Sequence, residues 1–174
     1  MSEPDSGSDL ASISSKATRD GDGWVLEGTK IWTTSAHEHD WIIVLCRTAP
    51  ADHKARHAGL SQLIVDLKAP GVTIRPIRML DGSHHFNEVI FDNVQVPAER
   101  LVGNAGDGWK QVSSELAYER SGPERFLSTM PLVERCLQLV LAGPAAVGDI
   151  AAGRLLARLM TLRKMSLEIG RAHV

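Results

Sequence analysis

Apolar and polar positions alternate along residues 13–97 in the manner of β-strands. The alternating segments are rich in β-branched and aromatic residues and are separated by Gly, Pro and Asp. The turn DGDG precedes the first segment and favours a hairpin, because glycine adopts a positive φ without steric cost. Since no helix-period segment separates the strands, we predict a mostly antiparallel sheet, arranged as a sandwich or an open barrel. The predicted strands lie in residues 23–35, 41–48, 61–68, 71–80 and 87–97.

The hydrophobic period changes after the run PAERLVGNAGDG. Trp109, Val112 and Leu116 recur at helical spacing, and this spacing predicts an amphipathic helix. Either Asn104 or Asp107 can cap the beginning of that helix. The second part of the chain is therefore predicted to be helical.

Two further segments have a helical composition. Residues 123–142 contain Pro131, which cannot donate a backbone hydrogen bond, so this segment forms either one kinked helix or two helices. Residues 153–167 carry leucines at helical spacing and predict another amphipathic helix. The whole pattern predicts an α+β chain, an antiparallel sandwich or open barrel followed by a partial helical bundle.

The composition gives little sign of a charged macromolecular partner. Of the 174 residues, 43% are hydrophobic and 23% are charged, enough to form the core of one globular domain or two small ones. The formal net charge of −2 does not indicate a nucleic acid or a membrane surface as a partner. No segment approaches the roughly 20 apolar residues of a membrane span, and the N-terminus lacks the pattern of a signal peptide.

The two cysteines, Cys46 and Cys136, lie in apolar contexts and form no CxxC pattern. We interpret both as buried, reduced thiols, because disulfide frameworks and zinc sites use paired cysteines at short spacing. Reduced thiols and the lack of a targeting segment together predict a cytoplasmic location.

Five segments of the chain resemble the acyl-CoA dehydrogenase family, in the family's order and spacing. They are SEPDSGSDLAS, GWVLEGTKIWTTSA, WIIVLCRT, FNEVIFDNVQVP and LVGNAGDGWKQVSSELAYER. The resemblance covers nearly the whole chain and implies the family's middle β-domain at residues 1–103, followed by part of its C-terminal helical domain at residues 104–168. The family's N-terminal helical domain has no counterpart, so we expect residues 1–174 to be a fragment that is inactive by itself.

The last six residues, IGRAHV, fit nothing in the family at this place. They match the translation of a common sequencing adapter, so we interpret residues 169–174 as a non-native tail. Gly170 is expected to end the preceding helix.

The resemblance implies an FAD-dependent dehydrogenation. In the family a carboxylate removes the pro-R α-proton of an acyl-CoA thioester while the β-hydride passes to the flavin, which gives a trans-2-enoyl-CoA. Electron-transfer flavoprotein then accepts the electrons, and full-length members are homo- or hetero-oligomers. Two other functions fit the same segments, namely an oxygen-using flavin relative (an acyl-CoA oxidase or a monooxygenase) and a non-catalytic, acyl-CoA-binding partner subunit.

By the resemblance, the loop of residues 1–8 wraps the flavin pyrimidine edge and the cofactor pyrophosphate. Ser8 contacts either the pyrophosphate or the pantetheine of the acyl-CoA substrate. Trp32 covers one ring face and Thr34 donates a hydrogen bond to flavin N5. Without the resemblance, a strand Trp would be taken as core and two threonines as solvent-facing residues of an edge strand. The implied cofactor-binding residues are Ser2, Gly7, Ser8, Trp32, Thr33 and Thr34.

The pair Glu119 and Arg120 supplies the candidate catalytic residue. Many members of the family place the catalytic Glu further along the C-terminal domain, whereas a minority place it on this helix in a similar Glu-Arg pair. Helical geometry puts both charges on the apolar stripe of Val112 and Leu116, where an apolar setting raises a Glu pKa towards that of a base. We predict Glu119 as the base and Arg120 as a substrate- or helix-end-binding residue. The alternative is a helix end at Gly122 with both side chains in solvent.

Other polar residues are predicted to be structural. His84 and His85 have no third ligand at metal spacing, and the family uses no metal, so we interpret them as part of a turn. The run HKARH at 53–57 is predicted to be a solvated loop. Glu3 and Asp9 are expected to order the first loop rather than to transfer protons.

Overall fold

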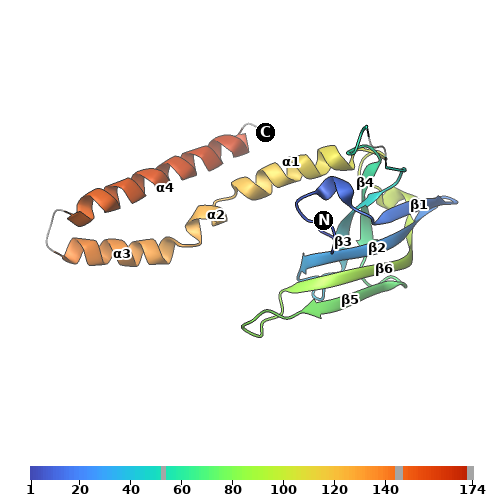
Figure 1. The fold of residues 1–174 in the computed structure, drawn as a ribbon, viewed down its shortest axis with the longest axis horizontal. Helices are drawn as coiled ribbons and strands as arrows, with labels where there is room; N and C mark the ends of the chain where they lie inside the picture. The colour runs from blue at the N-terminus through green and yellow to red at the C-terminus, as the bar shows by residue number, and fades with distance from the viewer. Residues whose placement is uncertain (52–53, 144–146, 172–174) are drawn as a thin grey trace. The chain divides into compact units, whose positions relative to one another are not determined.

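The computed structural model describes residues 1–51, 54–143 and 147–171 (Figure 1). The chain divides into two compact units, Met1–Val112 and Ser113–Val174. The first unit contains the predicted strands and the beginning of the first predicted helix, and the second contains the remaining helical residues. Each unit is described by itself.

The first unit is built on one six-stranded sheet, with the strand order β4-β3-β1-β2-β6-β5. Neighbouring strands are antiparallel except for β1 and β3, which form a short parallel pair. This confirms the predicted mostly antiparallel sheet. The strands are β1 Lys16–Asp20, β2 Gly23–Thr34, β3 Trp41–Arg47, β4 Leu60–Asp66, β5 Val72–Ile77 and β6 Phe86–Pro97, and two short 3-10 turns occur at Leu10–Ser12 and Ala98–Arg100.

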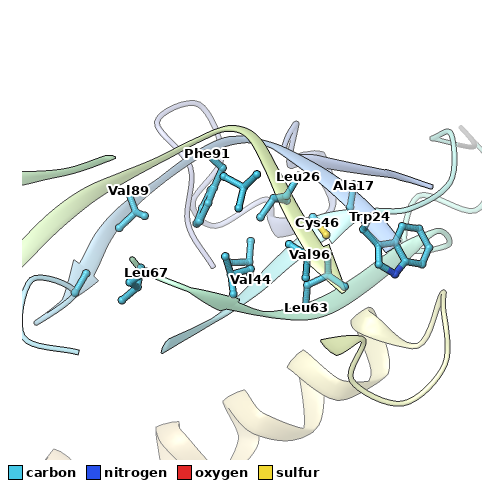
Figure 2. Packing of buried hydrophobic residues seen from close by; sticks show 13 residues of the cluster. Ala17, Trp24, Leu26, Val44, Cys46, Leu63, Leu67, Val89, Phe91 and Val96 are labelled. Carbon is cyan, nitrogen blue, oxygen red and sulfur yellow. The ribbon is translucent and has the colours of Figure 1, made fainter. Parts of the chain in front are cut away.

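The sheet curves so that its two halves share one core. Leu26 and Phe91 extend from β2 and β6, and Val44 and Leu63 face them from β3 and β4 (Figure 2). All four are nearly inaccessible to solvent, and burying side chains of this kind contributes about 1.5–3 kcal/mol each. Because one curved sheet encloses the core, the structure has the open-barrel form of the prediction.

The two long strands β2 and β6 pair over most of their length, but β1 covers only the first part of β2. Lys16 pairs with Glu27 and Asp20 pairs with Gly23, so the later residues of β2 extend beyond β1. The pairing of β2 with β6 is interrupted by register shifts between Leu26 and Gly28 and between Lys30 and Thr33. The irregular second half of β2 lies where the predicted cofactor residues occur.

Gly28 occupies the first irregularity of β2 with a φ of +142°, a conformation that side chains rarely adopt. An added Cβ would also lie 2.7 Å from the Cα of Ser15. We expect Gly28→Ala to lower the free energy of unfolding by about 1–3 kcal/mol more than Gly82→Ala, because overpacking against the backbone adds to conformational strain. Gly82 is the matched control, since its φ is +82° and an added Cβ there would meet nothing within 4 Å. Urea unfolding of both variants measures the difference, and equal losses would contradict it.

The helices are α1 Gly108–Ser121, α2 Glu124–Leu127, α3 Met130–Ala142 and α4 Val147–Arg171. Asp107 immediately precedes α1, and Asn104 donates a hydrogen bond of 3.1 Å to its carboxylate. Pro131 lies in the first turn of α3, where a missing N–H costs nothing, so the predicted segment forms two helices rather than one kinked helix. Within the second unit α3 packs alongside α4 (Figure 1).

Two predictions about the helical part are wrong. Gly170 does not end its helix, because α4 continues to Arg171; a single helical glycine costs only about 1 kcal/mol. Cys136 is exposed, whereas Cys46 is buried as predicted. Val133 and Leu137 lie on the covered side of α3, and Cys136 points away from it, so the apolar context of Cys136 in the sequence did not indicate burial.

In the part of the chain that the structure describes, none of the helices combines the length and the hydrophobicity that crossing a bilayer requires.

Candidate functional site

A buried ion pair anchors the first loop to the sheet. The Lys30 Nζ of β2 lies 2.7 Å from Glu3 Oε1, and the two side chains are only 1% and 3% exposed. The second carboxylate oxygen, Oε2, accepts hydrogen bonds from the backbone N and the hydroxyl of Ser14, at 2.6 and 2.8 Å. The backbone N of Ser15 donates to Oε1 at 3.0 Å. Glu3 therefore orders the loop, as predicted, and Lys30 is a partner that the sequence analysis missed.

The surroundings of Glu3 favour its charged form. Burial alone would raise the pKa of this carboxyl, but the hydrogen bonds and charge of Lys30, together with those from Ser14 and Ser15, lower the pKa from 4.5 to about 2. Burial also lowers the pKa of the Lys30 ammonium, and Glu3 offsets part of that effect. Several donors bond to the Glu3 carboxylate, so Glu3 and Lys30 form a charged pair.

The low pKa of Glu3 predicts a loss of stability in acid. The unfolded chain takes up a proton at Glu3 as the pH falls through 4.5, whereas the folded chain does so only near pH 2. Because the unfolded state then binds more protons, we expect Glu3 to contribute about 3 kcal/mol that is lost between about pH 5 and about pH 2. Other carboxylates titrate in the same range, so the test compares the pH dependence of urea unfolding in the natural chain and in Glu3→Gln. Parallel curves for the two proteins would contradict this assignment.

A tight turn follows Glu3 and presents the next residues to solvent. Glu3 and Ser6 exchange backbone hydrogen bonds of 2.8 and 3.1 Å, and the Ser6 hydroxyl donates to Asp9 O at 2.7 Å. Gly7 and Ser8 are exposed beyond this turn. Asp9 forms an ion pair with Arg56, at 2.6 Å, and so helps to order the loop, as predicted.

The loop runs beside the second half of β2. The backbone N of Ile31 donates to the carbonyl oxygen of Ser2 at 2.9 Å. This bond brings Ser2 of the predicted cofactor-binding residues next to the segment that begins with Trp32. Gly7 is exposed further along the same loop.

Trp32 is a surface residue and does not fill the core. Its side chain is 55% exposed, its φ is +61°, and its ring meets the edge of Phe86 at a centroid distance of 6.0 Å. Thr34 is exposed and Thr33 is half-buried. A large, exposed aromatic face beside hydroxyl groups is a surface on which a planar heteroaromatic ligand can stack.

A polar cluster that the sequence analysis missed contacts the backbone of Thr33. Asn87 of β6 is completely buried, and its side chain contacts three polar atoms: Thr33 O at 3.0 Å, His84 Nε2 at 2.8 Å and His37 Nδ1 at 3.2 Å. The rings of His37 and His84 are stacked with their centroids 3.9 Å apart. His84 and His85 lie in the connection before β6, as predicted, and His85 O accepts the backbone N of Ser35 at 2.8 Å.

The described part of the loop before β4, residues 54–57, is exposed, as predicted. His57 of this loop stacks on Trp109, which lies in the first turn of α1, at a centroid distance of 3.8 Å and an interplanar angle of 4°. Arg56 of the same loop holds Asp9, whereas His53 lies outside the described residues. Within residues 1–51, 54–143 and 147–171, no group of His, Cys, Asp and Glu could hold a metal ion.

Glu119 lies near the end of α1, in the second unit. Its side chain is 55% exposed and its Oε1 lies 3.1 Å from Arg125 Nη2. Within the described residues, Glu119 therefore lacks the expected apolar surroundings. The buried side of α1 ends near Leu116, which is only half-buried. Arg120 belongs to the same helix, but its side chain lies outside the described residues.

The donors on the first unit have the chemistry that a flavin requires. Reduced flavin carries negative charge on its pyrimidine side, which hydroxyl and backbone N–H groups stabilise, and its ring is a large flat surface. Exposed Ser8, Gly7 and Thr34 supply hydroxyl and backbone N–H groups, and Trp32 supplies an aromatic face. Residues 1–8 and 32–34 therefore fit such a cofactor.

Comparison with known proteins shows the family of the chain. Residues 1–94 match the family described as "Acyl-CoA dehydrogenase, middle domain". The chain is 50% identical over 119 residues to "Acyl-CoA dehydrogenase IpdE1" of Mycobacterium tuberculosis, and 46% identical over 118 residues to "Acyl-CoA dehydrogenase FadE29" of the same organism; each match covers 68% of this chain and 30% of the relative.

Solved structures give the same result. The fold matches "Tcur3481-Tcur3483 steroid ACAD G363A variant" with a TM-score of 0.83 and 32% identity, over 98% of this chain and 46% of that one. It matches the "ChsE4-ChsE5 complex from Mycobacterium tuberculosis" with a TM-score of 0.76 and 27% identity, over 99% of this chain and 46% of that one. The chain thus spans less than half of the length of these relatives.

Proposed function

Because the chain belongs to the acyl-CoA dehydrogenase family, we propose that it forms the flavin-binding part of an oxidoreductase that converts an acyl-CoA thioester to a trans-2-enoyl-CoA. The proposed cofactor is FAD. The β-sheet unit presents the flavin ring site, and the helix α1 supplies the base.

One observation carries this proposal. The hydrogen bond between Ile31 N and Ser2 O aligns the first loop with the exposed Trp32 and Thr34. Ser2 and Trp32 are far apart in the sequence but lie close together through this bond, which supports the proposal, and both belong to the residues that match the family.

Each residue has a defined task in the proposed reaction. Bound FAD supplies the acceptor for the β-hydride of the substrate. The hydroxyl of Thr34 and the backbone donors of the loop stabilise negative charge at the site, and Trp32 limits access of water to one side of it. Ser8 binds either the pyrophosphate or the pantetheine chain. Glu119 takes the α-proton and Arg120 binds the thioester substrate.

Flavin binding by the purified chain tests the proposal directly. FAD is added, the excess is removed by gel filtration, and the visible flavin absorption of the protein fraction is recorded. We expect retained flavin with a resolved, protein-bound band. Thr34→Val should weaken FAD binding about tenfold, since one hydrogen bond to a charged group is worth roughly 1.5 kcal/mol or more.

Thr73→Val is the matched control for Thr34→Val. Thr73 is exposed on β5 of the same sheet but lies outside the proposed site, so its FAD affinity should equal that of the natural chain. A colourless natural chain would reject flavin binding by these residues alone. Equal losses in both variants would reject the placement of the flavin beside Thr34.

The matched solved structures also bear on partners. Two of them are named as pairs of gene products, Tcur3481-Tcur3483 and ChsE4-ChsE5, so we propose that this protein assembles with further acyl-CoA dehydrogenase chains and passes electrons to electron-transfer flavoprotein. The same names favour a second candidate, a non-catalytic partner subunit that binds acyl-CoA. FAD and acyl-CoA binding without any turnover in the complete protein would support that second candidate.

A further inference from the structure

Asn87 is a completely buried polar residue on the strand that pairs with the proposed ring site. It lies on β6 directly opposite Thr33 of β2 in the strand register. A buried amide is costly unless its donors and its acceptor are used, and Asn87 uses all of them through Thr33, His37 and His84.

The contact with Thr33 fixes the orientation of the amide. A backbone carbonyl only accepts hydrogen bonds, so the atom 3.0 Å from Thr33 O must be the Asn87 amide nitrogen. The second N–H of the same nitrogen then faces His37 Nδ1 at 3.2 Å. The remaining oxygen faces His84 Nε2 at 2.8 Å.

This orientation fixes the proton positions on both rings. His37 accepts at Nδ1, so its proton is on Nε2, which lies 3.6 Å from Glu38 Oε1. His84 must donate from Nε2 to the Asn87 oxygen. The stacked rings and the amide therefore form one network with a single consistent arrangement of hydrogens.

The network supports a strained part of the backbone. Trp32 has a φ of +61°, a left-handed conformation that costs a non-glycine residue roughly 1–2 kcal/mol, and it lies in the register shift between Lys30 and Thr33. Such a conformation persists only where neighbouring contacts hold it. The bond from Asn87 to Thr33 O is a contact that holds the residue immediately after Trp32.

We propose that Asn87 is a positioning residue, which, together with His37 and His84, holds the irregular turn of β2 that presents Trp32 and Thr34 to the flavin. The role of the presented residues rests on the proposed function. The network itself does not, so the two are tested by separate measurements.

The first measurement is the protonation pattern of the histidine rings in the 15N-labelled chain without flavin. NMR correlation of ring nitrogens and carbon-bound protons is recorded at about pH 8, above the usual range of histidine titration. We expect His37 to show an unprotonated Nδ1 and His84 to show a proton on Nε2. In Asn87→Asp the carboxylate can only accept, so His37 should move its proton to Nδ1.

Asn87→Ala should leave His37 as a mixture of both tautomers and should shift the indole N–H signal of Trp32. Gln95→Ala is the matched control, because Gln95 is exposed on the same strand, and it should change neither signal. If Asn87→Ala fails to fold, Asn87→Asp, which keeps the size of the side chain, tests the network by itself through the proton position on His37. An unchanged His37 pattern in Asn87→Asp would overturn the network.

The second measurement is the dissociation constant of FAD. We expect Asn87→Ala, or Asn87→Asp where the first variant does not fold, to raise it about tenfold, and Gln95→Ala to leave it unchanged. An unchanged constant for an Asn87 variant, in a natural chain that binds FAD, would overturn the positioning role. Failure of the natural chain to bind FAD would overturn both the proposed flavin site and this role, while the ring pattern would still decide the network.

Discussion

Replacing Lys30 with methionine should lower the free energy of unfolding by about 3–5 kcal/mol, because it leaves the Glu3 carboxylate buried without its cation. Lys30 is 1% exposed and Glu3 is 3% exposed, so water cannot replace the missing charge. The hydrogen bonds from Ser14 and Ser15 remain, but they do not neutralise the carboxylate. A loss of this size is a large part of the 5–15 kcal/mol that holds a typical domain folded.

Urea unfolding at neutral pH measures this loss, and Lys16→Met is its control. Lys16 pairs with Glu27 at 2.9 Å, but these side chains are 60% and 40% exposed, so breaking that pair should cost at most about 1 kcal/mol. Glu3→Gln in the Lys30→Met background removes the buried charge and should recover part of the stability. Similar losses in Lys30→Met and Lys16→Met would show that burial of the first pair does not matter.

Glu119→Gln should reduce turnover by about 10²–10⁴-fold if this residue is the base of the proposed reaction, because glutamine has the same shape but cannot accept the α-proton. The relatives are longer than this chain, so the measurement is made in an active member of the family into which residues 1–174 have been placed. Exchange of the substrate α-proton with deuterated water reports the proton transfer separately from the hydride transfer.

Glu115→Gln is the control for Glu119→Gln, since Glu115 is exposed and lies one turn earlier on α1. It should leave both turnover and α-proton exchange unchanged. Full activity of the Glu119→Gln protein would move the base to another part of the family's C-terminal domain. It would also make the ion pair with Arg125 the main role of Glu119.

The strands of the first unit were predictable because their alternation is strong and their turns contain glycine. The irregularities were not, since they depend on contacts between distant residues. In β6 the buried positions run through Asn87, Val89 and Phe91 and then shift by one at Asn93, whose φ is +51°. The alternation of apolar and polar residues in the sequence reveals such a shift only when the pairing of the strands is known.

Two polar residues of the site carried a signal that could have been read. Lys30 has the same parity in its strand as Trp24 and Leu26, and Asn87 has the same parity as Val89. A charged or amide residue in an inward position of a strand indicates a buried partner. The identity of that partner was not readable, because Glu3 and Thr33 are brought to these residues by the fold of the sheet rather than by spacing in the sequence.

The partial cover of β2 by β1 has a consequence for association between molecules. Beyond Glu27 the free side of β2 is closed by the first loop, through the bond from Ile31 N to Ser2 O. If the loop detaches, that side becomes an open strand edge beside an exposed Trp32, which another chain can extend by backbone pairing. The ion pair between Glu3 and Lys30 holds this loop in place. It therefore also protects the protein against association through sheet edges.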